Sequence, residues 1–213
     1  IYRYLRKHNK KMFMGAFGMD HYWVQGCTTT PRLFRYSDFN IGNNPIDNSY
    51  TREQIADWQD TPKAHLNKLI AHDCNGIIAG LYEYYAVYEK EFKEKLTYIP
   101  FPVEEEITGK LHDGKRKIRF FIGINRERSR YKGTDIMLRA LERIARDYPT
   151  RCEVLKAENV PFAQYKQMID SCDVLLDQLY GYSPAMNALL AMAKGKIVVG
   201  GAEEEYYQQL DEK

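Results

Sequence analysis

The chain has 213 residues, which is long enough for one large or two small domains that each bury a core. Its 31 basic and 29 acidic residues nearly cancel, so the composition does not indicate bulk attraction to nucleic acid or to a membrane surface. No apolar run approaches the ~20 residues that span a bilayer, and no signal peptide is present. We therefore expect the charges that matter for function to be local.

The four cysteines and the first residue give two further expectations. Cys27, Cys74, Cys152 and Cys172 form no CxxC pair and have no nearby His at ligand spacing. We expect buried free thiols in a reducing compartment rather than a zinc site or a disulfide framework. The sequence begins at Ile1, inside a predicted helix rather than at Met, so we expect a fragment, and a targeting segment could lie upstream.

The first half of the chain alternates predicted strands and helices. Residues 28–48 are rich in Thr, Pro, Asn, Gly and Asp, which predicts a long loop with one helical turn at 32–39. Apolar runs and helical spacing predict strands at 11–17, 76–79 and 96–99, and helices at 1–8, 51–73 with a break or kink before Pro62, and 82–93. This alternation indicates a parallel sheet.

Polar residues follow the first predicted strand. Gly18-Met19-Asp20-His21 comes directly after it, and ligands of open α/β sheets bind at the carboxyl ends of strands. Asp20 or His21 is therefore a candidate contact for a substrate. The alternative is that Asp20 forms a turn or caps the next helix, as Asp often does after a strand.

Residues 103–114 separate the two halves. They are polar, contain three consecutive Glu residues with Gly109 and Gly114, and lack any periodicity. We interpret residues 103–115 as a linker between a first domain at 1–102 and a second at 116–213.

The second half opens with a candidate anion site. Residues 117–124 predict a strand, and residues 134–148 predict a helix with one apolar face. The loop between them carries Arg126, Arg128, Arg130 and Lys132. Because a helix N-terminus and guanidinium or ammonium groups both attract phosphate oxygens, this loop favours an anionic ligand. The alternative is a solvated basic loop.

Residues 172–199 predict a second strand, loop, helix and strand. Ser183 suits the N-cap of the helix and Pro184 its first position, so the backbone N–H groups of Ala185 and Met186 could receive an anion. Gly195 ends the helix, and residues 196–199 begin the next strand. The acidic run 203–205 follows at the start of a further helix, where carboxylates are favourable.

Residues 117–207 together resemble the nucleotide-binding half of retaining glycosyltransferases of the two-Rossmann-domain (GT-B) type, in the glycosyltransferase group 1 or family 4-like class. In that family a Gly is followed by an Arg and, six residues later, by a Lys-Gly pair, and here Gly123, Arg126 and Lys132-Gly133 match. The family's "aDv" strand and "EAMAxGxPVV" helix phrases correspond to residues 172–174 and 190–199.

The sequence departs from that pattern at two positions. The family usually has two Glu residues eight apart, the second of which holds the nucleotide ribose, and here Tyr182 and Leu190 stand in those places. Neither can accept a hydrogen bond as a carboxylate would. Asn187, or a residue of the run 203–205 such as Glu205, is the alternative ribose contact. An active subfamily and an inactive relative would both fit this pattern.

The resemblance implies an α/β fold of two Rossmann-like domains, each incomplete at a chain end. It implies a metal-independent, retaining hexosyltransferase without a cofactor, which moves a sugar from a nucleotide-sugar donor to a carbohydrate or lipid-linked acceptor in surface polysaccharide synthesis. Nucleic acid is not an expected partner, and the expected location is the cytoplasm or the inner face of the membrane. The implied catalytic residues are Arg126, Lys132 and Asp20, and the implied nucleotide contacts are Gly123, Tyr182, Ser183, Ala185, Met186, Asn187 and Glu205.

Two other classes of function stay open from the sequence. One is a catalytically degenerate protein that binds a nucleotide sugar without turnover, which the missing Glu pair favours. The other is an epimerase on the same scaffold, which would need acid and base residues in the cleft.

Overall fold

The computed structural model describes residues 1–103, 114 and 116–210. It is an α/β structure with parallel sheets, and the chain separates into two compact units, Ile1–Phe101 and Pro102–Lys213. The linker predicted at 103–115 lies almost wholly outside the described residues. The two units are described separately below.

The first unit is built on a parallel sheet in the order β1-β5-β6. The sheet residues Ala16, Ile77 and Ala79 pack with Tyr22 and Tyr88 in its core. The strands are β1 (Phe13–Ala16), β5 (Gly76–Ala79) and β6 (Leu96–Tyr98), and the helical segments are α1 (Tyr2–His8), α2 (His21–Thr28), α3 (Ser49–Trp58), α4 (Pro62–Asp73), α5 (Tyr82–Phe92) and η1 (Lys93–Lys95). The predicted alternation of strand and helix is confirmed here.

Two predictions for the segment between β1 and β5 had different outcomes. The expected break before Pro62 is confirmed, because Thr61 caps α4 and Pro62 occupies its first turn. The helical turn predicted at 32–39 is wrong. That stretch instead contributes to a small antiparallel sheet of β2 (Tyr36–Ser37), β3 (Asn40–Ile41) and β4 (Asn44–Pro45). Asn40 explains the difference, because its buried amide bonds to nearby backbone carbonyls and so competes with helix formation.

The second unit contains a parallel sheet in the order β10-β9-β7-β8. Its strands are β7 (Ile118–Ile124), β8 (Cys152–Glu158), β9 (Val174–Leu176) and β10 (Ile197–Val199), and its helical segments are η2 (Arg126–Arg128), α6 (Ser129–Lys132), α7 (Thr134–Asp147), α8 (Phe162–Ser171), α9 (Met186–Ala193) and α10 (Glu204–Gln209). The expectation of a parallel α/β unit is confirmed. The two-domain GT-B arrangement stays a prediction.

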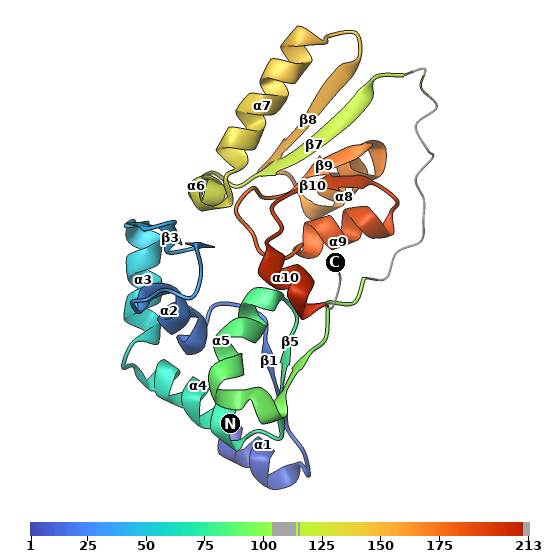
Figure 1. The fold of residues 1–213 in the computed structure, drawn as a ribbon. Coiled ribbons are helices and arrows are strands. Elements are labelled where there is room, and N and C mark those ends of the chain that lie inside the picture. Colours follow the sequence, from blue (N-terminus) through green and yellow to red (C-terminus); the bar gives the residue numbers. More distant parts are fainter. Residues whose placement is uncertain (104–113, 115, 211–213) are drawn as a thin grey trace. The chain divides into compact units, whose positions relative to one another are not determined.

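Helices cover both faces of this sheet (Figure 1). Alternate residues of β7 point to opposite sides, as in any strand. Ile122 packs with Met137 of α7, whereas Phe121 packs with Ile169 of α8 and Ala191 of α9. The chain therefore leaves β7 toward one face and leaves β9 toward the other. In open α/β sheets such a point of divergence creates a crevice at the carboxyl ends of the strands, where ligands bind.

The opposite edge of this sheet is closed by an ion pair. Arg116 donates to both carboxylate oxygens of Asp173 at 2.6 and 2.5 Å, and the Arg119 amide donates to the same carboxylate at 2.9 Å. Asp173 immediately precedes β9, so these contacts join the amino ends of β7 and β9. The Asp of the "aDv" phrase thus lies at the edge away from the crevice.

The basic loop after β7 and the start of α9 differ from the expectations. The loop is mostly helical, because it contains the short segments η2 and α6. The predicted helix start at Ser183 and Pro184 is wrong, since α9 begins at Met186 with Ala185 as its N-cap residue. The Asp177 carboxylate accepts the Ala185 N–H, which holds that residue in the preceding loop.

All four cysteines are free thiols, as expected, and Cys27, Cys74 and Cys172 are buried. Within residues 1–103 and 116–210, no helix is both long and apolar enough to cross a membrane.

Candidate functional site

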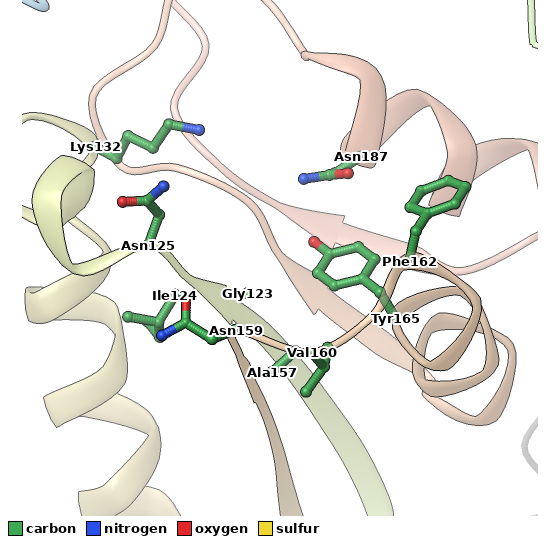
Figure 2. Close-up of a pocket in the computed structure, with 10 residues that line it drawn as sticks. All are labelled: Gly123, Ile124, Asn125, Lys132, Ala157, Asn159, Val160, Phe162, Tyr165 and Asn187. Carbon is green, nitrogen blue, oxygen red and sulfur yellow. The ribbon is translucent and has the colours of Figure 1, made fainter.

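A pocket of about 310 Å³ lies at the carboxyl ends of β7 and β8 in the second unit (Figure 2). Gly123 and Ile124 end β7 and form part of its floor, and Ala157 of β8 lies beside them. The start of α8 and the start of α9 contribute Phe162 and Asn187. The pocket therefore occupies the crevice that the divergence of the chain after β7 and β9 predicts.

Four polar groups converge on this pocket. Figure 2 shows the Lys132 ammonium, the Asn125 and Asn187 amides and the Tyr165 hydroxyl directed toward the same space. The Oδ1 atom of Asn125 accepts the Arg128 N–H at 3.2 Å, and its amide nitrogen is turned toward the pocket. Burial raises the pKa of the Tyr165 phenol to about 12, so this hydroxyl stays protonated and can donate at neutral pH. The set is rich in donors, which suits a ligand with many acceptor oxygens.

Lys132 is positioned by its own backbone. Its carbonyl accepts the N–H of Leu179 at 2.8 Å, which binds the end of α6 to the loop after β9. Gly133, the next residue, has φ +67°, and a Cβ built there would lie 2.7 Å from the Leu179 Cβ. Glycine is thus required both for the left-handed backbone and for the close approach of the two loops. This contact holds the Lys132 side chain at the edge of the pocket.

Asn187 is the second residue of α9 and lines the pocket. The N-cap residue Ala185 has no side-chain acceptor, so the N-cap position makes no side-chain capping hydrogen bond. The first N–H groups of a helix have no partner in the helix itself, and they carry the positive end of its dipole. The start of α9 can therefore receive an anion beside the Asn187 amide.

A buried carboxylate lies behind the lysine. Burial raises the pKa of Asp177, while the nearby Lys132 ammonium and the Ala185 N–H act in the opposite direction. Asp177 immediately follows β9, and its own N–H donates to the Val199 carbonyl at 3.0 Å. Asp177 therefore connects the loop after β9 with Lys132 and with the start of α9.

Gly123 has a packing role that the sequence does not reveal. A Cβ at this position would lie 2.7 Å from the Tyr165 hydroxyl and 3.0 Å from the ring. The Tyr165 ring also meets Phe121 edge to face, with centroids 5.1 Å apart. Gly123 therefore makes room for a tyrosine that lines the pocket, and the space next to its Cα is already filled.

Arg126 has a partner outside the pocket. Its guanidinium pairs with the carboxylate of Glu158 at the end of β8, and the Arg126 side chain is 81% exposed. Hydrogen bonding by Arg126 holds the pKa of Glu158 below its usual range. The structure thus brings Lys132, Gly123 and Asn187 together around the pocket, while Arg126 faces Glu158.

The other predicted nucleotide contacts do not line this pocket, and they are Tyr182, Ser183, Ala185, Met186 and Glu205. Tyr182 and Ser183 are buried in the loop before α9, and Met186 is exposed at its first turn. Glu205 is half-buried in the first turn of α10. Leu190 packs against the apolar cluster that contains Phe121 and Ile169. The position where the family has a ribose-binding carboxylate is therefore apolar in its surroundings as well as in its side chain.

Asp20, in the first unit, is the N-cap residue of α2. One carboxylate oxygen accepts the Trp23 N–H at 2.9 Å, and the other accepts the Tyr88 hydroxyl at 2.7 Å. The side chain is buried, which raises its pKa. These contacts support the capping alternative, and a substrate contact by Asp20 stays a prediction. The neighbouring His21 bonds through Nδ1 to the Trp58 carbonyl at 2.9 Å.

Sequence reasoning missed the part of the pocket formed by β8 and α8. Asn159 and Val160 follow β8, and Phe162 and Tyr165 begin α8. A helical signal was present, because Phe162, Tyr165, Met168 and Ile169 recur at helical spacing after Pro161. No comparable sequence pattern marked Asn125 as a residue of the pocket.

In the described residues no group of three or more His, Cys, Asp or Glu side chains could hold a metal ion. Comparison with protein-family models and with curated proteins finds no match to this chain. The resemblance to glycosyltransferases is therefore carried by the motifs alone.

Proposed function

We propose that the second unit binds a nucleotide sugar in the pocket at the ends of β7 and β8, and that the protein transfers the sugar to a carbohydrate or lipid-linked acceptor. One observation carries the proposal. The Lys132 ammonium and the start of α9 at Asn187 lie on opposite sides of one pocket at the topological switch point of a parallel sheet. A diphosphate bound between them would meet a full positive charge and the positive end of a helix dipole.

The proposed chemistry needs little more than this arrangement from the second unit. When the bond between the sugar and the diphosphate breaks, negative charge develops on the leaving phosphate. Lys132 would stabilise that charge directly, and the N–H groups at the start of α9 would add oriented dipoles. The Asp177 carboxylate interacts electrostatically with Lys132, and this attraction would hold the ammonium in place. The nucleotide ribose would then meet the Asn187 amide, which can both donate and accept.

Binding without turnover is a second candidate, and two observations favour it. Arg126 pairs with Glu158 outside the pocket, and the half-buried Leu190 packs against the apolar core. Two of the groups that the family uses on the donor would then be missing from the cleft. The chain would keep the phosphate site while lacking part of the catalytic set.

Calorimetry on folded variants tests the binding proposal. Lys132→Ala should weaken both a nucleoside diphosphate and inorganic pyrophosphate by about 1.5–3 kcal/mol, because each loses a charge-assisted contact. Asn187→Ala should weaken the nucleoside diphosphate alone, because pyrophosphate has no ribose. Lys117→Ala is the matched control, since this exposed lysine precedes β7 at the opposite edge of the same sheet. Equal affinities in wild type and Lys132→Ala would overturn the assignment.

Donor hydrolysis separates the two candidates. Slow release of free sugar from a panel of nucleotide sugars supports a transferase, and its loss in Lys132→Ala would link the activity to the pocket. Tight binding without any release supports the non-catalytic alternative.

A further inference from the structure

A second pocket lies in the first unit, in the segment between α2 and α3. It has a volume of about 350 Å³ and is lined by Thr30, Arg32, Arg35, Gly42 and Asn43, among others. We call it the Arg32 pocket. All of its lining residues belong to the first unit, so the pocket is complete without the second.

The walls of the Arg32 pocket are held by a buried asparagine. Asn40 is fully buried, and its amide nitrogen donates to the carbonyls of Phe34 and Arg35 at 3.1 Å each and of Gly42 at 2.9 Å. Its Oδ1 atom accepts the Ser37 hydroxyl at 2.5 Å. Because one buried side chain bonds to three carbonyls of this loop, the loop backbone that carries the side chains of the pocket wall is held in place.

A further bond connects this loop to the helix before it. The Leu33 N–H, next to Arg32, donates to the Gly26 carbonyl of α2 at 3.0 Å. The backbone next to Arg32 is therefore tied to α2.

Arg32 presents an unmet donor. Its Nε atom is buried, and it has no hydrogen-bond partner within the part of the chain that the structure describes. Burying such a donor without a partner costs free energy, so Arg32 would gain if its guanidinium shifted to meet an acceptor on a bound group. Asp38 and Arg32 both influence the buried Cys27 thiol, and the Asp38 carboxylate accepts the Trp23 indole N–H at 3.0 Å.

The charges that line the Arg32 pocket have one sign. Arg32 and Arg35 both contribute to its walls, and no acidic residue does so among the residues described. The planar guanidinium fork matches the two oxygens of a carboxylate or a phosphate, which it can hold by two parallel hydrogen bonds. Thr30 and Asn43 add groups that could hydrogen-bond to the remainder of such a ligand.

We propose that the Arg32 pocket is an oxyanion site that binds the carboxylate or phosphate group of a small ligand through the guanidinium groups of Arg32 and Arg35. An acidic sugar and a sugar phosphate both carry such a group. The proposal does not depend on nucleotide binding in the second unit, because the two pockets share no residue.

NMR of the arginine Nε–H groups in the full chain tests this proposal. Inorganic phosphate, glucuronate and neutral glucose would be titrated separately into protein labelled with ¹⁵N. We expect the Arg32 Nε–H signal, identified by its loss in Arg32→Lys, to shift with phosphate or glucuronate and to stay in place with glucose. A larger effect of glucuronate identifies a carboxylate ligand, and a larger effect of phosphate identifies a phosphoryl ligand.

Affinity measurements on variants complete the test. Arg32→Lys should raise the dissociation constant of the better anion by about tenfold, equivalent to ~1.4 kcal/mol. Arg52→Lys is the control, because Arg52 is an exposed arginine of the same unit that pairs with Asp47. An unmoved Arg32 signal with both anions, or equal affinities in Arg32→Lys and Arg52→Lys, would overturn the proposal. Should Arg32→Lys fail to fold, the Arg32 Nε–H signal is assigned in the wild type by through-bond correlation to the Arg32 side-chain and backbone atoms, and the wild-type titration remains decisive.

Discussion

In both units polar side chains follow a strand of a parallel sheet. In the first unit the protein itself supplies hydrogen-bond partners for them, whereas in the second they line a pocket. After β1, the Asp20 carboxylate is buried, and its two oxygens accept hydrogen bonds from Trp23 and Tyr88. After β7, Asn125 and Lys132 reach a pocket of about 310 Å³. The carboxyl end of a strand is therefore a suitable place for a site, but the neighbouring side chains decide whether the polar atoms are left for a ligand.

Hydrogen-bond accounting explains the difference. A buried polar atom needs a partner, and the protein can supply it or leave it to a ligand. The first unit supplies both partners of Asp20 from α2 and α5. In the second unit the short segments η2 and α6 carry Lys132 to the pocket edge, and the N-cap residue of α9, Ala185, makes no side-chain capping hydrogen bond.

The largest effect that would sharpen this comparison is expected at α9, where Asn187 lines the pocket and the half-buried Leu190 packs against the apolar core. Leu190→Glu should lower the free energy of unfolding by roughly 3–5 kcal/mol, because it removes apolar contacts and places a carboxylate among apolar side chains. Urea unfolding measures this change. Met192→Glu is the control, since Met192 is 45% exposed on the same helix and should stay within about 0.5 kcal/mol of wild type. A stable Leu190→Glu protein with tighter nucleotide binding would instead place residue 190 at the cleft.

Asp20 should show the next largest effect. Asp20→Ala removes the cap of α2 and leaves the buried Tyr88 hydroxyl without its acceptor, so we expect a loss of roughly 2–3 kcal/mol in the free energy of unfolding. Asp20→Asn keeps one oxygen that can accept the Trp23 N–H, and its NH2 group can donate to the Tyr88 hydroxyl oxygen, so it should cost less than ~1 kcal/mol. If Asp20→Ala were as stable as wild type but inactive, Asp20 would be a substrate contact, and the contrast between the two units would fail.

Arg126 tests whether a basic residue near the pocket contributes to ligand binding when it already has an acidic partner. Because Arg126 already pairs with Glu158, Arg126→Ala should weaken nucleoside diphosphate binding by less than ~0.5 kcal/mol, well below the effect of Lys132→Ala. Calorimetry on both variants measures the difference. Comparable losses in the two variants would mean that Arg126 leaves Glu158 when the ligand binds, as the sequence resemblance implies.

The smallest effect concerns pH. Burial raises the pKa of Asp20 above that of the unfolded chain, so the folded state keeps this proton to higher pH. The stability that Asp20 contributes is then fully present below its unfolded pKa of about 3.9 and is lost as the pH rises through its folded pKa. The stability of wild type relative to Asp20→Asn should therefore fall over that window in urea titrations at several pH values. A constant difference between the two proteins would contradict a raised pKa.

The sequence predicted most of the second unit's framework, because its strands and helices have clear periodicity. β7 and α7 were expected within a residue or two, and the helix after β9 was expected two residues too early. Ser183 and Pro184 have strong local preferences for a helix start, but the loop contact between Asp177 and Ala185 outweighs them. That contact joins residues eight positions apart through a loop, so no local pattern reveals it.

The candidate site was predictable in part. Lys132 and Asn187 were named from motif spacing and helix position, and both line the pocket. The pairing of Arg126 with Glu158 could not be foreseen, because it depends on the register of β7 against β8, a strand that the sequence analysis did not identify. For the same reason the contribution of Tyr165 was missed, and with it the packing role of Gly123.

The ion pair at the amino edge of the second sheet bears on how motifs in such chains should be weighed. Asp173 joins Arg116 and the Arg119 backbone at the start of the strands, at the end of the sheet opposite the pocket. An alignment that counts this Asp as evidence of nucleotide recognition would be counting a residue that holds two strands together. Chains that have lost all catalytic ability would still keep such an Asp for as long as they keep the sheet. Under the proposed function, the positions of Lys132 and Asn187 are the better marks of an active relative.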